Sequence, residues 1–281
     1  MKKIVALFAF VSVLCSLSAQ RVNETVTMFG KDQLQGFTIN VSNAPANIVA
    51  DALADKFENQ FSLKGSNKKG FRVYENQTCK AFGDAHYDIY FNTNTVGKKN
   101  SQYTQVTLVV TNGNLNSITF SNDPRTSRNI VMFLENLPND VEAYKIKLRI
   151  EQLKNELANL KKERENLEKN RVKTNDKIAT TSEEAKKTTD QIQKLTAEIE
   201  KMQDQFNTNQ DPTLKEQIDK ANKDKQALLK TQSSTQKTLL NLNDDIVKLN
   251  SKLDTNAKET ANRETELKTL EQQQQQQQQQ Q

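Results

Sequence analysis

The chain is poor in the residues that build most catalytic and metal sites: its 281 residues include 1 His, 2 Cys, 7 Gly and no Trp. A single histidine excludes a metal site made of several histidines, and no Gly-rich phosphate loop, CxxC pair or HExxH motif occurs. Hydrophobic residues make up 35% of the chain, whereas ordinary globular chains contain about 45–50%. One large hydrophobic core is therefore excluded, and part of the chain must be held by a narrow apolar seam or be unfolded.

A block of charge of one sign is also missing. The chain has 40 Lys and Arg against 35 Asp and Glu, a net charge of +5, and the two signs are mixed along its length. A protein that binds nucleic acid normally concentrates Lys and Arg on one face or in one run. We therefore expect no nucleic-acid partner.

The first 19 residues have the parts of a secretory signal peptide. A basic start at Lys2 and Lys3 precedes an apolar run at 4–14 and small residues near positions 16–19. The apolar run is too short to span a bilayer, so we expect cleavage near Ala19-Gln20 and a secreted or periplasmic mature chain. No later stretch is apolar and long enough for an integral membrane segment, so none is expected in the mature chain.

Cysteine usage excludes an internal disulfide in the mature chain. Cys15 lies in the signal peptide and follows Leu14, where a lipoprotein would have a small residue, which favours soluble export. Cys79 is then the only cysteine left, and we expect it to be a buried free thiol or to pair with another molecule.

Residues 20–138 have a globular composition and predict an α+β head domain. Alternating apolar residues indicate strands, an apolar residue every fourth position from Val49 to Phe61 indicates a helix, and Asp123-Pro124 is typical of a helix start. We expect an antiparallel sheet covered on one face by two helices. The expected elements are strands at 25–29 and 37–41, a helix at 45–61, strands at 71–82, 86–96, 103–111 and 117–121, and a helix after 123.

Residues 139–271 carry two long apolar repeats with a mean spacing of 3.5 residues, which predict a coiled coil. In the first, thirteen of eighteen positions are apolar. Its positions are Ile146, Ile150, Leu153, Leu157, Leu160, Arg164, Leu167, Arg171, Thr174, Ile178, Thr181, Ala185, Thr188, Ile192, Leu195, Ile199, Met202 and Phe206. In the second, which is displaced by one residue, eleven of seventeen are apolar. Its positions are Leu214, Ile218, Ala221, Lys225, Leu228, Gln232, Thr235, Leu239, Leu242, Ile246, Leu249, Leu253, Asn256, Thr260, Arg263, Leu267 and Leu270.

The segment 207–212 separates the two repeats and carries helix stop and start signals. Asn can end a helix in the left-handed conformation, Asp211 can cap the next helix, and Pro212 suits its first position. A straight helix would place this proline in its interior at a cost of about 3 kcal/mol. We therefore expect an antiparallel coiled-coil hairpin with its turn at 207–212; the alternative is a parallel homodimeric rod kinked at Pro212.

A fold-back about residue 210 pairs seam residues that are equally distant from it along the chain. The expected layers are Met202 with Ile218, Ile192 with Leu228, Ile178 with Leu242, Leu167 with Leu253, and Leu153 with Leu267. Polar seam residues also meet, Thr188 with Gln232 and Arg164 with Asn256. The tail that follows, Gln272–Gln281, is a run of ten glutamines, and we expect it to be a repeat expansion without a dedicated role.

The best reactive constellation is Cys79 with His86, with Asp88 on the same strand. If Gly83-Asp84 were a two-residue turn, these three side chains would share one sheet face, and the histidine could activate the thiol. Two reactive residue types meet easily by chance in a hairpin, so we assign no catalytic, cofactor-binding or metal-binding residue, and we expect no enzymatic activity.

Two functions are compatible with this organisation. The first is an exported structural or interaction protein, a head on a coiled-coil stalk that acts as spacer or adaptor in the cell envelope, with envelope proteins or a second copy as partners. The pattern resembles the helical hairpins of periplasmic membrane-fusion adaptors, but β structure resumes after those hairpins, so their activity is not carried over. The alternative is a chaperone-like or ligand-binding module that uses the hairpin arms or the free face of the head sheet.

Overall fold

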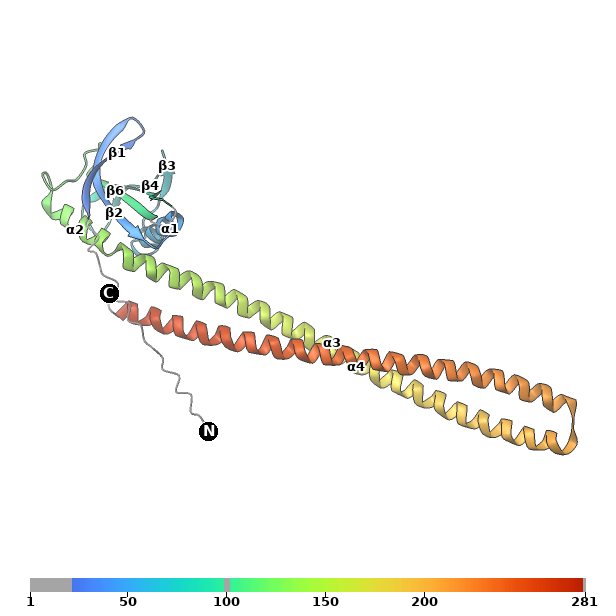
Figure 1. Cartoon of the computed structure of the whole chain (residues 1–281). Coiled ribbons are helices and arrows are strands. Elements are labelled where there is room, and N and C mark those ends of the chain that lie inside the picture. Colours follow the sequence, from blue (N-terminus) through green and yellow to red (C-terminus); the bar gives the residue numbers. More distant parts are fainter. Residues whose placement is uncertain (1–21, 99–101, 280–281) are drawn as a thin grey trace. The chain divides into compact units, whose positions relative to one another are not determined.

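The computed structural model describes residues 22–98 and 102–279, which form an antiparallel sheet with helices followed by two long helices paired as a hairpin (Figure 1). The predicted fold class is therefore confirmed. Two compact units result: one contains the sheet and continues to Arg149, and the other runs from Ile150 to Gln275. The predicted signal peptide lies outside the described residues.

The sheet has six strands in the order β1-β2-β6-β5-β4-β3, and every neighbouring pair is antiparallel. The elements in chain order are β1 (Asn23–Phe29), β2 (Asp32–Ser42), α1 (Ala46–Asp55), the π-helical turn η1 (Lys56–Gln60), β3 (Ser66–Lys68), β4 (Phe71–Thr78), β5 (His86–Val96), β6 (Tyr103–Thr111), α2 (Pro124–Glu135), α3 (Leu137–Asn209) and α4 (Pro212–Gln279).

Two strand predictions need correction. The expected strand at 117–121 is reduced to an isolated bridge between Thr111 and Ser117, because Asn114 and Leu115 both adopt positive φ angles and lengthen the turn after β6. Conversely, the short strand β3 was not predicted, because its three residues are polar and exposed and show no alternation.

The main core lies between one face of the sheet and the helices. Its central aromatic residue is Phe57, whose ring centroid is 5.2 Å from that of Phe133 and 5.0 Å from that of Tyr74. The other fully buried side chains of this core come from α1, α2 and the sheet, and include Leu53, Ile130, Leu134, Phe37, Ile39, Ile89 and Leu108.

The π-helical turn explains the four-residue spacing of apolar residues in the first helix. A step of four residues exceeds the 3.6 residues of an α-helical turn, so the apolar positions would drift around the helix. The wider turn η1, closed by a 3.1 Å hydrogen bond from the Phe61 N–H to the Lys56 carbonyl, counteracts this drift. Phe57 and Phe61 both stay against Phe133 as a result.

The opposite face of the sheet carries a second, smaller core, because the sheet curls over it. Phe29 at the end of edge strand β1 packs on Phe71 of β4 and on Tyr90 of β5, with ring centroids 5.8 and 4.9 Å apart. Gly36 of β2 permits the curl, because a Cβ atom there would lie 2.6 Å from the Leu108 carbonyl oxygen. The inside of the curl is thus filled by the protein's own side chains.

The first turns of α3 belong to the head. The boundary at 138–139 between the predicted head and the predicted coiled coil lies inside the helix α3, and Pro138 suits its position because the first N–H groups of a helix have no intrahelical partner. Asp140 forms a buried ion pair with Lys56 of η1. Burial raises the pKa of Asp140 despite the opposing effect of the Lys56 ammonium.

In the hairpin unit, the burial pattern follows the predicted repeat. Of the eighteen seam positions in the first repeat, only Arg164 and Arg171 are exposed, and none of the seventeen positions in the second repeat is exposed. The long arginine side chains can leave the seam because their charged ends reach water. The displacement of the second repeat by one residue is therefore the signature of two helices facing each other.

The turn between α3 and α4 is shorter than expected. Helix α3 continues to Asn209, and Gln210, with a φ of 52°, takes the left-handed conformation that was expected of an asparagine. The Asp211 carboxylate accepts a 2.9 Å hydrogen bond from the Thr213 N–H and caps α4, and Pro212 is its first residue. The predicted stop and start signals thus act within two residues.

One polar contact between the arms agrees with the predicted fold-back register to within one residue. Gln232 donates a 3.0 Å hydrogen bond to Thr189, next to the predicted partner Thr188. The predicted pair of Arg164 with Asn256 is wrong: Arg164 bonds Glu168 of its own helix. The Asn256 side chain instead donates to the Leu160 carbonyl, at 3.1 Å, and to Glu163.

Replacing Asn256 should show what this buried polar group costs. Its side chain is 3% exposed, and its amide oxygen is buried without a hydrogen-bond partner among the described residues. We expect Asn256→Leu to increase the free energy of unfolding of the hairpin by about 1 kcal/mol, since an unpaired buried group costs about that much. Thermal unfolding followed by far-UV circular dichroism measures this, with Asn256→Ala as a control that should lower stability. A lower stability for the leucine variant than for the wild type would contradict the assignment.

Candidate functional site

The three residues of the predicted reactive constellation do not come together: Cys79 lies in the core, whereas His86 and Asp88 contact Asn76. Cys79 follows β4 and is fully buried in the main core. Its carbonyl accepts hydrogen bonds from the N–H groups of Phe82 and Gly83, at 2.9 and 3.1 Å, which closes a tight turn. Burial raises the pKa of the Cys79 thiol to about 11, so that it is protonated at neutral pH.

His86 and Asp88 instead lie at the end of the β4-β5 ladder. The exposed His86 ring has its Nδ1 3.3 Å from the Asn76 carbonyl oxygen, and Asp88 accepts a 2.7 Å hydrogen bond from the Asn76 N–H. Thr78, rather than Ala81, pairs with His86. The predicted two-residue turn is therefore wrong.

Phe82 is the physical reason for this difference. Its ring packs on Phe133 and Phe57, with centroids 5.3 and 6.3 Å apart, and it is 1% exposed. Burying this ring pulls the segment after β4 out of the sheet and into the core, together with Cys79. The alternation of apolar and polar residues in this segment does not predict that Phe82 leaves the sheet.

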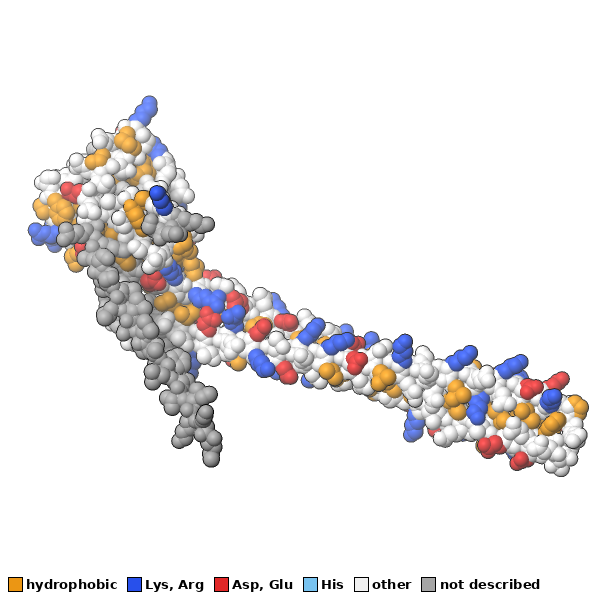
Figure 2. All heavy atoms as spheres, viewed as in Figure 1, with side chains coloured by type: hydrophobic (Ala, Val, Ile, Leu, Met, Phe, Trp, Pro, Cys, Tyr) orange, Lys and Arg blue, Asp and Glu red, His pale blue; other side chains and the backbone are white. Residues whose placement is uncertain are grey.

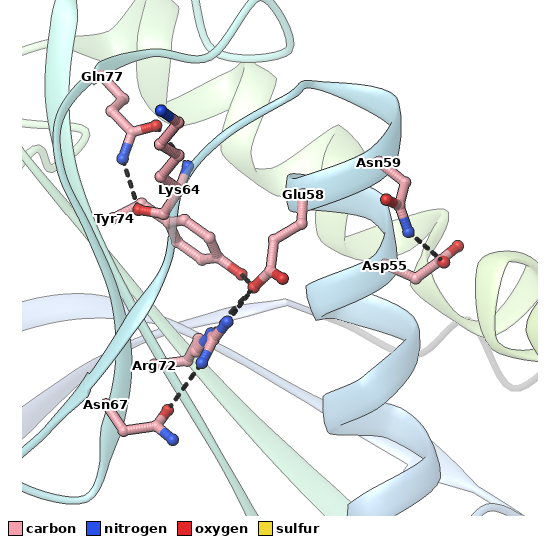
Figure 3. Close-up of polar contacts among 8 residues, drawn as sticks. All are labelled: Asp55, Glu58, Asn59, Lys64, Asn67, Arg72, Tyr74 and Gln77. Carbon is pink, nitrogen blue, oxygen red and sulfur yellow. Dashed lines mark hydrogen bonds and ion pairs between the residues drawn. The ribbon is translucent and has the colours of Figure 1, made fainter.

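The densest polar cluster of the head joins η1 to β4 (Figure 3). One oxygen of Glu58 accepts hydrogen bonds from the Arg72 guanidinium, at 3.0 Å from Nε, and from the Tyr74 hydroxyl, at 3.0 Å. Arg72 also donates to Asn67 of β3, at 3.3 Å. Gly65 lets the loop pass close by, since a Cβ atom there would lie 2.6 Å from the Tyr74 ring.

The charged and polar groups of this cluster bind one another. The hydrogen bond to Glu58 raises the pKa of Arg72, and burial raises the pKa of Tyr74, so both side chains stay protonated. All three nitrogens of the Arg72 guanidinium and the Tyr74 hydroxyl donate to protein acceptors. The cluster therefore joins the π-helical turn to the sheet edge. The sequence predicted a strand that contains Arg72 and Tyr74, but it had no signal for the carboxylate that meets them.

A groove of about 380 Å³ beside this cluster is lined by residues of α1, β3, β4 and β5. Three cations border it, and each has an anionic partner: Lys68 pairs with Glu75 at 2.6 Å, Lys69 with Asp32 at 3.7 Å, and Arg72 with Glu58. An anionic ligand would have to compete with these carboxylates.

Residues 22–98 and 102–279 contain no group of three or more His, Cys, Asp or Glu side chains placed to hold a metal ion. Within the same residues, no helix combines the length and the apolar character that crossing a membrane requires. No family model, curated protein or solved structure matches the chain.

The burial of Cys79 predicts low reactivity. Because the thiolate is the nucleophile, and because its pKa is raised to about 11, we expect alkylation by iodoacetamide to be at least about 100-fold slower in the folded chain than in the denatured chain. A cysteine introduced by Met132→Cys, at a position that is 67% exposed, provides the control and should react rapidly in the folded state. Equal rates for the two cysteines would contradict the buried placement and would reopen a thiol-based mechanism.

Proposed function

We propose that the protein is an exported structural or interaction protein, in which the folded head is carried on the coiled-coil hairpin and the hairpin acts as a spacer or adaptor in the cell envelope. The observation that carries this proposal is the pair of seam repeats whose positions, apart from Arg164 and Arg171, are buried or half-buried along both α3 and α4. A paired seam of this length fixes distance, because a helix that buries one face against a partner resists bending and unfolding.

The dimensions of the hairpin unit support a spacer. The arm that begins at Ile150 and ends at Asn209 reaches about 90 Å at a rise of about 1.5 Å per residue. Its two ends can therefore engage partners that are much farther apart than the diameter of a small domain. The expected signal peptide at 1–19 supports export to a compartment where such a distance must be bridged.

The alternative was a chaperone-like or ligand-binding module that uses the hairpin arms or the free face of the head sheet, and its second form, a ligand-binding head, has no comparable support. It needs an open apolar surface on the free face of the sheet, but Phe29 and Leu34 cover this face by packing on Phe71 and Tyr90. The groove beside β3 and β4 is bordered by cations that are already paired. We therefore assign the interactions of the head to its outer surface and not to the free face of its sheet or to this groove.

Shortening both arms together tests the spacer role. Deleting 153–166 and 254–267 removes two heptads from facing parts of α3 and α4, keeps both seams in phase, and shortens the hairpin by about 21 Å. In a length-restored control, the two deleted segments are replaced by copies of 188–201 and 219–232, which begin at the same heptad positions. Photo-cross-linking groups at Met132 in the head and at Gln210 in the turn report the partners at the two ends in the native envelope.

For a spacer, the shortened chain should keep its helix content and its cross-link from Met132 but lose the cross-link from Gln210, and the length-restored control should regain it. In every variant, mass spectrometry should find a mature chain that starts at Gln20 or Ala19. The same products from the shortened and full-length chains, no product at either end, or an uncleaved chain retained inside the cell would each contradict the proposal.

A further inference from the structure

The two sides of the hairpin can be told apart by heptad position, with a and d forming the seam. Lys154 and Glu271, both at position e, form a 3.2 Å ion pair across the arms. Lys161 and Glu264, also at e, line one groove together with Ala158 at b. Positions b and e of α3 and α4 therefore lie on the same side of the hairpin, as antiparallel pairing requires.

The other side is formed by positions c and g. A separate groove of the hairpin unit is lined by Glu163, Lys252 and Glu259, all at position g, and by Thr255 at position c. Both grooves lie between α3 and α4, and neither shares a g or an e residue with the other.

In the middle of the hairpin, the side formed by positions b and e is almost free of charge. We call this surface the uncharged face; it spans 172–196 of α3 and 226–250 of α4. Only one of its sixteen residues, Lys186, is charged. The sixteen are Val172, Asn175, Ala179, Ser182, Lys186, Thr189, Gln193, Thr196, Gln226, Leu229, Ser233, Gln236, Leu240, Asn243, Val247 and Asn250.

The contrast with the opposite side is large. Within the same two ranges, seven of the fourteen residues at positions c and g are charged. They are Lys173, Lys177, Glu184, Lys187, Lys194, Asp245 and Lys248. The low charge of the uncharged face is therefore a property of one side and not of the chain's composition in this region.

The uncharged face also holds the hairpin's exposed apolar side chains. Among the described residues of the hairpin unit, four large hydrophobic side chains are exposed, and all four lie on this face: Leu240 and Val247 at 67%, Val172 at 55% and Leu229 at 43%. Figure 2 shows hydrophobic side chains that reach the surface at several points along the hairpin, beside charged ones. Exposed apolar residues gathered on one side of a soluble coiled coil mark an interaction surface.

The seam is partly polar over the same stretch. Thr174, Thr181 and Thr188 of α3 and Gln232 and Thr235 of α4 occupy seam positions there. The apolar residues that would normally fill the seam are thus partly replaced by residues on the outside. A partner that covered the outside would supply the apolar burial that this stretch of the hairpin lacks.

We propose that a second copy of this chain docks on the uncharged face, so that two hairpins form a four-helix bundle over this stretch. A two-fold interface brings a surface against itself, so it needs a surface that does not repel its own copy. The uncharged face meets this requirement, whereas the opposite side would place several lysines against lysines. Layers of apolar and amide side chains between facing helices are the usual interior of such bundles.

The size of the uncharged face is sufficient for a stable dimer. At about 1.5 Å per residue and about 10 Å per helix, 25 residues of two helices cover about 750 Å². A typical specific interface buries about 800 Å² on each partner. This inference does not depend on the proposed spacer function, because it concerns only the hairpin's own surface.

Sedimentation equilibrium of the mature chain, residues 20–281, over a concentration series tests the proposal. The variant Leu240→Glu with Val247→Glu places two carboxylates on the uncharged face. The matched control, Ser234→Glu with Asn241→Glu, adds the same charge to the same helix at exposed positions of the opposite side. Far-UV circular dichroism confirms that each variant keeps its helices.

We expect the wild type and the control to sediment with the mass of two chains, and we expect the Leu240/Val247 variant to dissociate, with a dissociation constant at least about 100-fold higher. Head, seam and glutamine tail are unchanged in both variants, so association through them would survive both. A wild type with the mass of one chain at every concentration, or a Leu240/Val247 variant that stays dimeric, would overturn the proposal.

Discussion

The seam between α3 and α4 is the contact on which the hairpin depends. Neither helix could persist alone in water, because most of its surface is polar and its only apolar face is a narrow stripe. Pairing within one chain shields both stripes, and the Asp211-Pro212 corner makes this possible by ending one helix and starting the next within two residues. Within 172–196 and 226–250 the seam is interrupted by threonines and a glutamine, and the same stretch carries the exposed apolar side chains of the hairpin. The stability and the surface chemistry of the hairpin are linked at this level.

The head is held differently, since apolar cores lie on both faces of its sheet. The helices cover one face around Phe57, and the curl of β1 and β2 closes the other around Phe29. The buried pair of Lys56 with Asp140 holds the first turns of α3 in this structure, and this pair is weak evidence for stability but strong evidence for a fixed position, because moving one partner would leave a buried charge unpaired. A filled interior leaves the outer surfaces of the head to make its interactions.

The parts of this structure that could be predicted from sequence are those repeated many times along the chain. The heptad phase and the fold-back register were predictable because the same spacing of apolar residues recurs many times along both helices. Single contacts between distant segments were not predictable. Examples are the packing of Phe29 on Phe71, the burial of Phe82 that removes Cys79 from the sheet, and the meeting of Glu58 with Arg72.

Asn256 was expected to meet Arg164. Arginine can reach water from a seam position while asparagine cannot, so the shorter side chain stays inside and donates a hydrogen bond to the Leu160 carbonyl. The uncharged face had a sequence signal, the run of uncharged residues at positions b and e, but its meaning depends on knowing that both arms present these positions to the same side.

The most direct measurement of the central claim is a disulfide cross-link between the arms. Cysteines introduced by Ile192→Cys and Leu228→Cys are equally distant from residue 210 and should face each other across the seam, whereas Cys79 is buried and does not compete. Under oxidising conditions, the account predicts that nearly all chains close internally and migrate as a fast monomer on non-reducing gels, at low concentration and in an excess of unmodified chains. Covalent dimers in place of this closed monomer would mean that the helices pair between chains, and the antiparallel hairpin within one molecule would then be wrong.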